Sequence, residues 1–332
     1  MPKFSKTSWR RVLCSVALGA GLSAADADTY DALMADARRD CVKAAPVWPV
    51  RDQPPAGTPP CDSTGFYYGI DKPVDYTQAR LCAFAEPDLG VLAMLYANGR
   101  GVARDDGLAR KAVCDDRDAA PAETEGRLKH LARMERDAKE QAAGLDVCDD
   151  ATSGMMTGWC AGIASKRKAP QRDARLATLA AKWPSTHQAA FAALRQAQDA
   201  FVDARDGEVD KTGSARASLM VAAEEARRDA FVALVARAEA GRVGAGTPAQ
   251  AKAGDERMNA TWTRLKATRD TDVTTVAMKD ILAAQRAWLK YRDAWLRFAA
   301  LRYPALPAPT WIALLTDDRE KELAALLESR AR

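Results

Sequence analysis

Residues 281–299 repeat apolar side chains every three or four positions, and this spacing limits the fold more than any other feature of the chain. At about 100° per residue, an α-helix brings six positions within about 80° of one another: Ile281, Gln285, Trp288, Arg292, Trp295 and Ala299. Alanine is abundant elsewhere, whereas valine and isoleucine are sparse, and this balance favours helix over sheet. We therefore predict an all-α fold.

The first 27 residues are typical of a secretory signal peptide. Four basic side chains within residues 3–11 precede an apolar run over residues 12–24, and residues 25–27 form an A-x-A cleavage site. The run is too short to span a membrane, and the leucine before Cys14 does not fit a lipoprotein acceptor site. We expect cleavage near Ala27, and a periplasmic or secreted mature chain with no membrane span.

The mature chain keeps an even number of cysteines, and in an oxidising compartment this implies three disulfides. The six are Cys41, Cys61, Cys82, Cys114, Cys148 and Cys160. A zinc site is the competing interpretation, but the chain has no C-x2-C spacing and only two histidines, His130 and His187. We predict no metal and no cofactor.

Charge is distributed unevenly after the signal peptide. Residues 28–147 hold 16 basic and 21 acidic side chains, and residues 148–332 hold 29 and 23. The two halves either attract different partners or carry two ordinary solvated surfaces. The near-neutral total does not indicate a nucleic-acid binder.

Proline and glycine mark the boundaries of the helical segments. A short helix is expected over residues 29–45, a proline-rich extended loop over 46–60, and further helices to about Gly144. A glycine-rich break over residues 240–248 separates two long helical blocks, about 170–240 and 255–330. The predicted domains are the signal peptide (1–27), an N-terminal helical domain (28–147) and two further helical units (148–240 and 255–332).

The N-terminal domain contains a repeat with a period of 30 residues. Its second copy is marked by Tyr96, Gly99, Gly101, Asp105 and Ala109, and the first copy repeats the aromatic residue, the first glycine, the aspartate and the alanine. This pattern predicts a helix, a tight glycine turn, an aspartate cap and a second helix. It resembles the Sel-one-like repeat, which implies helical hairpins that bind proteins.

The hairpin also suggests a disulfide pairing. If its turn is centred near residues 70–72, Cys61 and Cys82 lie side by side on antiparallel helices. Cys148 and Cys160 are close enough in sequence to pair locally, which leaves Cys41 for Cys114. This is one of fifteen possible pairings.

The C-terminal half contains a second repeat, offset by 87 residues. The segment from Ala197 that includes Gln198, Phe201, Arg205 and Asp206 matches the segment from Ala284 that includes Gln285, Trp288, Arg292 and Asp293. A following helix carries Arg227 in the first copy and Arg319 in the second. We predict a duplicated helical-hairpin domain.

The second copy resembles the LprI-type lysozyme-inhibitor family. The resemblance rests on residues 282–294, which include Tyr291, and on the spacings Met258-Asn259-x2-Trp262 and Thr316-x2-Arg319-x3-Leu323. Residues 148–237 look like a degenerate copy. The chain lacks the cysteine that family members usually have after Arg292-Asp293. The resemblance implies an exported helical domain and, for the LprI branch, inhibition of host lysozyme.

Two interpretations remain open for the polar residues in the stripe of residues 281–299, the six positions that share one helix face. Gln285 and Arg292 lie on the apolar face of their helix, and buried polar groups need partners. They either bind this helix to the following return helix of the same hairpin or form a surface that binds a partner protein. Asp293 is expected at the surface or as a partner one turn away.

Nothing in the sequence indicates catalysis. His130 is expected on a charged helix and His187 in a loop, and both fit surface or packing roles. The pairs of adjacent aspartates fit helix ends. We therefore expect a protein-binding module, with lysozyme inhibition as the leading hypothesis. The alternatives are a periplasmic scaffold or assembly adaptor that uses the Sel-one-like repeats, and a structural protein without a fixed partner.

Overall fold

The computed structural model describes residues 41, 46–270 and 274–330, and all regular structure within these residues is helical. The all-α prediction is confirmed. The signal peptide and most of the helix expected over residues 29–45 lie outside the described residues. The proline-rich stretch is a loop, as predicted, interrupted only by the 3-10 turn η1 (Val50–Asp52).

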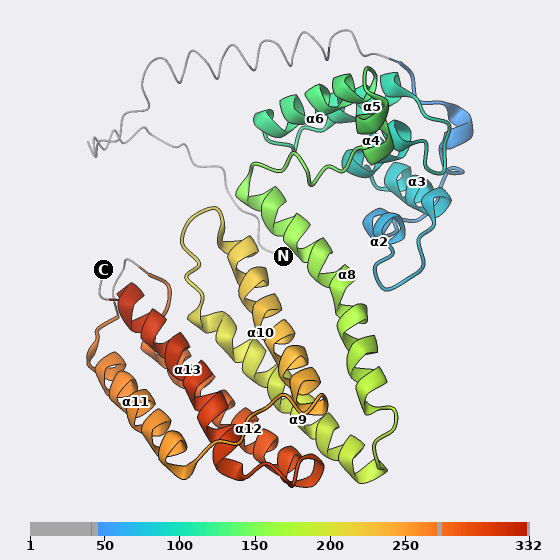
Figure 1. Cartoon of the computed structure of the whole chain (residues 1–332). Helices are drawn as coiled ribbons and strands as arrows, with labels where there is room; N and C mark the ends of the chain where they lie inside the picture. The colour runs from blue at the N-terminus through green and yellow to red at the C-terminus, as the bar shows by residue number, and fades with distance from the viewer. Residues whose placement is uncertain (1–40, 42–45, 271–273, 331–332) are drawn as a thin grey trace, which may run out of the picture.

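Among the described residues, six short helices form the N-terminal part, drawn blue to green in Figure 1. They are α2 (Ser63–Tyr68), α3 (Tyr76–Ala85), α4 (Leu89–Asn98), α5 (Asp106–Asp115), α6 (Pro121–Met134) and α7 (Ala138–Ala143). Neighbours in sequence pack against each other, and α4 is the central helix, with every residue from Val91 to Ala97 buried.

Two turns in this part have the same geometry. Gly69 and Gly99 end α2 and α4 with φ of 69° and 63°, a left-handed conformation that glycine adopts without strain. Asp75 and Asp105 then cap α3 and α5 by accepting hydrogen bonds from backbone N–H groups. Ala109 is fully buried at the second crossing, and Gly101 lies so close to Tyr76 that a Cβ there would overlap its backbone.

The three disulfides join the predicted cysteine pairs: Cys41–Cys114, Cys61–Cys82 and Cys148–Cys160. The first closes a separation of 73 residues, and the others close 21 and 12. All of them lie at or before residue 160, so the helices beyond that point are held by noncovalent packing alone.

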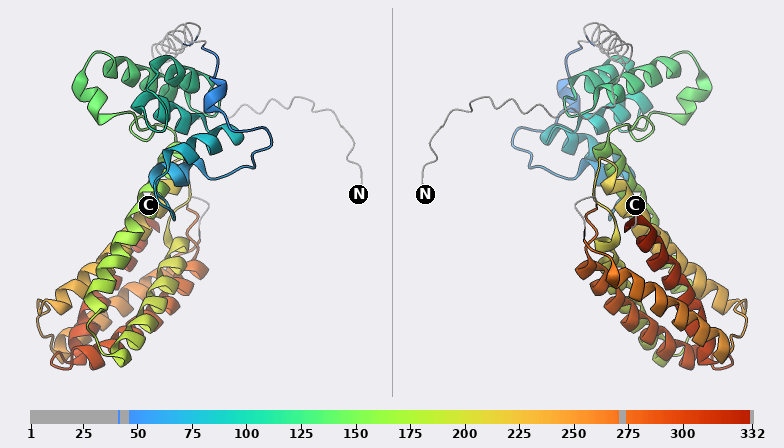
Figure 2. Two further views of the ribbon diagram at one scale, coloured as in Figure 1. Left: turned by 90° about the vertical axis from the view of Figure 1, so that its right-hand side faces the viewer. Right: turned by 90° about the vertical axis from the view of Figure 1, so that its left-hand side faces the viewer.

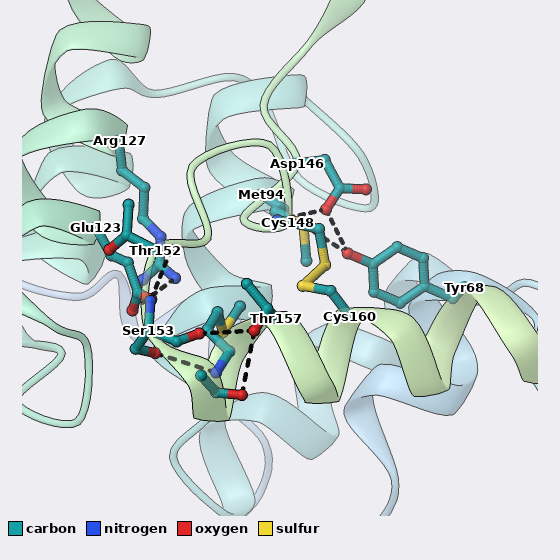
Figure 3. The surroundings of a disulfide bond; sticks show 12 residues. Tyr68, Met94, Glu123, Arg127, Asp146, Cys148, Thr152, Ser153, Thr157 and Cys160 are labelled. Atoms are coloured by element: carbon teal, nitrogen blue, oxygen red, sulfur yellow. Dashed lines mark hydrogen bonds and ion pairs between the residues drawn. A yellow bond between two sulfur atoms is a disulfide. The ribbon is translucent and has the colours of Figure 1, made fainter. Parts of the chain in front are cut away.

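Helix α8 (Gly154–Ala180) connects the N-terminal part to the rest of the molecule (Figures 1 and 2). Its start is fixed to the N-terminal part by the Cys148–Cys160 disulfide, which reaches its second turn, and by the buried Glu123 carboxylate. This carboxylate accepts hydrogen bonds from the N–H groups of Thr152 and Ser153, just before the helix (Figure 3). The prediction that this helical block starts near residue 170 is wrong, because Pro170 lies inside the helix without ending it.

Helix α8 and five further helices form an elongated bundle (Figure 2). The five are α9 (Ser185–Arg205), α10 (Arg216–Glu239), α11 (Pro248–Ala267), α12 (Met278–Arg302) and α13 (Ala308–Arg330), with a 3-10 turn η2 (Asp206–Glu208) after α9. The glycine-rich break is confirmed, but α11 starts earlier than residue 255 because Thr247 caps it and Pro248 is well suited to a first helical position. His187 lies in the first turn of α9 and not in a loop.

The bundle consists of three closely packed helix pairs: α8 with α10, α9 with α12, and α11 with α13. The stripe-bearing helix α12 therefore packs mainly on α9 and less on its return helix α13. This differs from the predicted helical hairpin, in which each long helix pairs with its return helix. Aromatic rings fill the α9–α12 contact, where Phe191 lies near Phe298 and Phe201 stacks on Tyr291.

Candidate functional site

A groove of about 330 Å³ lies between α11 and α12. Its walls combine apolar and polar side chains from the two helices: Asp255, Met258, Asn259, Trp262, Leu282, Gln285, Arg286, Leu289 and Arg292. All of them except Asp255 belong to two separate parts of the sequence on which the family resemblance rests. The structure thus brings the Met258-Asn259-x2-Trp262 spacing and the α12 stripe together.

Helix α11 is held in place by its contact with α13, along which it runs in parallel. Thr247 and Gln250 form a capping box at its start. Gly246 and Gly254 let the two backbones approach, because a Cβ at Gly246 would lie 2.8 Å from the Cα of Thr310. Thr261 donates a hydrogen bond of 3.0 Å to Glu320 further along the pair.

Two leucines of α12 are partly exposed at the groove. Leu282 and Leu289 are 37% and 38% exposed, and a separation of seven residues puts them on one face of the helix, two turns apart. Arg292 lies one turn further, with its guanidinium 5.3 Å from the centre of the Trp288 ring and its Nε without a partner among the described residues. Nε of Arg292 is buried, but 23% of the side chain is exposed, so the groove offers apolar contacts and a partly exposed guanidinium.

A buried ion pair lies behind the groove. Both side chains of the Arg319–Glu208 pair are fully buried, and two hydrogen bonds of 2.9 and 2.5 Å join them. Gln285 completes the arrangement by accepting a 2.8 Å hydrogen bond from Nε of Arg319. Gln285 thus ties α12 to α13, which is the structural interpretation given to it above.

More charged groups extend this cluster into the first unit. Glu322 accepts hydrogen bonds of 3.0 Å from both Arg205 and Arg319, and it also pairs with Arg227. The guanidiniums of Arg227 and Arg319 lie 5.6 and 5.5 Å from the centre of the Phe201 ring. Burial lowers the pKa of Arg227. The cluster thus connects α9, η2, α10, α12 and α13.

The other residues singled out from the sequence have packing or surface positions. Trp288 and Tyr291 are buried, and burial raises the pKa of Tyr291 to about 12. Gln198 is buried with its amide nitrogen unpaired among the described residues. Asp206 pairs with Lys211 at the surface, and Asp293 is exposed and lies 3.5 Å from Arg292.

The turn residues of the N-terminal repeat form part of the framework and not of the groove. Tyr96 is buried and donates a 3.0 Å hydrogen bond to Asp52, which anchors the proline-rich loop. Burial is the main reason that the pKa of Tyr96 is raised. Gly99, Gly101, Asp105 and Ala109 shape the α4–α5 turn.

Sequence reasoning missed Glu208 and Glu322, the two carboxylates of the buried cluster. Glu208 pairs with a residue 111 positions away, across the boundary between the two units. Glu322 carried a usable signal, because it follows Arg319 by three residues and so lies on the same face of α13.

The described residues contain no group of three or more histidine, cysteine or carboxylate side chains that could hold a metal ion. His130 is buried with Nδ1 3.3 Å from Asp150, so its role is packing within the N-terminal part. Among the helices that the structure describes, none is long and apolar enough to cross a membrane. The groove offers binding contacts and no nucleophile next to a base.

The family model described as "Lysozyme inhibitor LprI" matches residues 241–323. The chain carries an LprI domain. The match covers α11, α12 and most of α13, and with them both walls of the groove. The search of curated proteins and the search of solved structures returned no match.

The LprI match leaves about three quarters of the chain unassigned. It starts at residue 241, before the predicted boundary at 255, because it includes the glycine-rich break and the first turns of α11. It does not extend to residues 28–147 or 148–240. The Sel-one-like repeat and the degenerate LprI-like copy therefore stay predictions.

LprI is an inhibitor family and not a catalytic one, which fits a binding role and a protein partner such as lysozyme. Three disulfides together with an LprI domain suggest an exported protein.

Proposed function

We propose that this protein is a periplasmic or secreted lysozyme inhibitor that binds lysozyme with the α11–α12 groove of its LprI domain. The observation that carries the proposal is that the groove is built from residues of the LprI signature. Signature residues that only stabilised the fold would all lie inside it, whereas Leu282, Leu289 and Arg292 keep part of their surface open to solvent.

The chemistry of the groove suits a protein partner. Exposed leucines flanked by polar groups are typical of contact surfaces, and arginine is among the residues that contribute most at interfaces. The Arg292 side chain is 23% exposed, and the exposed part of its guanidinium can donate hydrogen bonds to a carbonyl or carboxylate group of lysozyme. Inhibition then needs only that the bound protein blocks access to the lysozyme cleft.

The buried cluster behind the groove supports tight binding. Gln285 belongs both to the groove wall and to the Arg319–Glu208 network. This network fixes α12 relative to α13, so the groove is formed before a partner arrives. Little conformational entropy is then lost on binding.

The test is the clearing of a cell-wall suspension by lysozyme in the presence of purified residues 28–332. The wild-type protein should slow clearing in proportion to its concentration. The double variant Leu282→Asp/Leu289→Asp should weaken inhibition by about tenfold or more, because it places two desolvated charges against the partner.

Leu301→Asp is the matched control, since Leu301 is an exposed leucine on the same helix outside the groove. It should inhibit like the wild type. Clearing at the uninhibited rate, even at a large molar excess of the wild-type protein, would refute lysozyme as the target. Equal inhibition by both leucine variants would refute the α11–α12 groove as the surface that binds lysozyme.

A further inference from the structure

A second and larger groove, of about 490 Å³, lies in the N-terminal part, outside the LprI match. It is bounded by the starts of α2 and α4, the α5–α6 connection and the first turns of α8. Figure 3 shows part of its wall, where Glu123 and Arg127 of α6 lie near the beginning of α8.

Carboxylates dominate the charge of this groove. Six acidic side chains line it together with one basic side chain, Arg127: Asp62, Glu86, Asp88, Asp116, Asp118 and Glu123. Arg127 is already paired with Asp116 and Glu123. Glu86 and Asp118 are exposed, and neither carboxylate has an ion-pair partner within the described part of the chain. The groove therefore attracts cations.

The same groove has an apolar wall on α8. Met155 is 69% exposed and Trp159 is 39% exposed, and four residues of spacing put them on one face of the helix. An exposed tryptophan next to carboxylates suits an alkyl chain that ends in a positive charge, because the ring binds both the chain and the cation. Methionine adapts its shape to varied apolar side chains.

The groove is held rigidly by the elements around it. The Cys61–Cys82 disulfide fixes the start of α2, and the Cys148–Cys160 disulfide fixes the start of α8. Glu123 accepts hydrogen bonds from the backbone N–H groups of Ala120, Thr152 and Ser153. The ring of Trp159 packs edge-on at 6.5 Å from that of Tyr68.

We propose that this acidic groove binds a cationic, amphipathic segment of a partner protein. Lysine or arginine side chains of the segment lie between Glu86 and Asp118 and over Trp159, and an apolar residue packs on Met155. The excess of acidic side chains over residues 28–147 extends the attraction beyond the groove itself. The surface lies in the region for which the sequence predicted an adaptor role, and it is independent of lysozyme binding at α11–α12.

The test uses residues 28–332 and a fluorescent twelve-residue peptide that alternates lysine and leucine, followed by fluorescence anisotropy. The peptide should bind, and binding should weaken as salt screens the charges. A peptide with glutamate in place of lysine should not bind. Glu86→Lys/Asp118→Lys should weaken binding by about tenfold or more, and Trp159→Ala by several-fold.

The matched control is Asp203→Lys/Glu328→Lys, which makes the same charge change at exposed carboxylates of the bundle. It should bind the peptide like the wild type. Equal weakening by both charge-reversal variants would overturn the proposal, because the attraction would then be a property of the net charge. Concentration-dependent dimers in sedimentation that Glu86→Lys/Asp118→Lys abolishes would also overturn it and would assign the groove to a second copy of the chain.

Discussion

At the scale of single residues, the chain places charged side chains in its interior and pairs each of them. Arg319 and Glu208 are fully buried, yet each of the three guanidinium nitrogens of Arg319 donates at least one hydrogen bond. Such a pair adds little net stability compared with an apolar pair, but removing one partner leaves a buried charge without compensation. The stability of the bundle therefore depends strongly on both side chains being present.

Glu208→Gln should lower the free energy of unfolding by about 3–5 kcal/mol, because Arg319 then keeps its charge without its main counterion. Urea denaturation measures the change. Asp206→Asn is the matched control in the same turn, since Asp206 is partly exposed and pairs with Lys211 at the surface. Its cost should stay below about 1 kcal/mol. Equal costs for the two variants would show that the buried pair has no special role.

Glu123 should make the stability of the N-terminal part depend on pH. Burial raises its pKa, but hydrogen bonds from Ser153, Thr152 and Ala120 outweigh this and lower the pKa below its ordinary value of 4.5. A carboxyl whose pKa is lowered in the folded state contributes stability above the unfolded pKa, and this is lost as pH falls through the folded pKa. The difference in urea midpoint between wild type and Glu123→Gln should thus be large near pH 7 and shrink below about pH 4.5. A difference independent of pH would contradict this role.

At the scale of helices, close packing between parallel helices depends on small residues. Gly158 of α8 lies against Ala217 of α10, and Gly154 lies against Ser214 in the turn before α10. A methyl group at Gly158 would overlap the Cβ of Ala217. Gly246 and Gly254 have the corresponding place in the α11–α13 pair. Glycine weakens a helix, so its presence here reflects the contact and not the helix itself.

Gly158→Ala should destabilise the protein by about 1–3 kcal/mol, because α8 must move away from α10 to admit the methyl group. Gly162→Ala is the matched control one turn later, where nothing lies within 4 Å of an added Cβ. It should stabilise the protein by up to about 1 kcal/mol, as alanine favours helix. Thermal unfolding measures both, and a shift in the same direction for the two variants would contradict the packing account.

The all-helical fold could be predicted from the sequence. The residues at which helices begin and end, and the helices that pack against each other, could be predicted only in part. The aspartate caps and the glycine turn around Gly99 and Asp105 are local, so their spacing was sufficient. Pro170 was misleading because its cost is outweighed by the packing of α8 along α10. The pairing of α12 with α9 was not predictable, since both its own return helix and another unit's helix offer an apolar face.

At the scale of the whole molecule, the bundle contains two three-helix units with the same internal contacts. In each, the first and third helices run parallel and pack closely, and the middle helices α9 and α12 pack on each other in antiparallel orientation. The duplication itself stays a prediction, because the LprI match does not extend to residues 148–240. The signature stripe was readable from its period, but Glu208 joins it from the other unit and had no sequence signal.

Covalent cross-links divide the molecule into two parts of different sensitivity to reduction. The Cys41–Cys114 bond closes 73 residues, and a loop of that size contributes about 4 kcal/mol. Reductant should therefore lower the melting temperature of the N-terminal part and leave the transition of the bundle unchanged in circular dichroism. Cys41→Ser/Cys114→Ser should reproduce most of this shift without reductant. An equal shift of both transitions would contradict the division.

Hydrogen exchange of residues 28–332 with and without saturating lysozyme tests most directly whether the LprI domain binds lysozyme through the α11–α12 groove. We expect slower exchange of amides in residues 255–262 and 282–292, the two walls of the α11–α12 groove, and unchanged exchange in α8 and α10. Exchange that lysozyme does not alter, or protection confined to residues before 160, would contradict the assignment of lysozyme binding to the LprI domain.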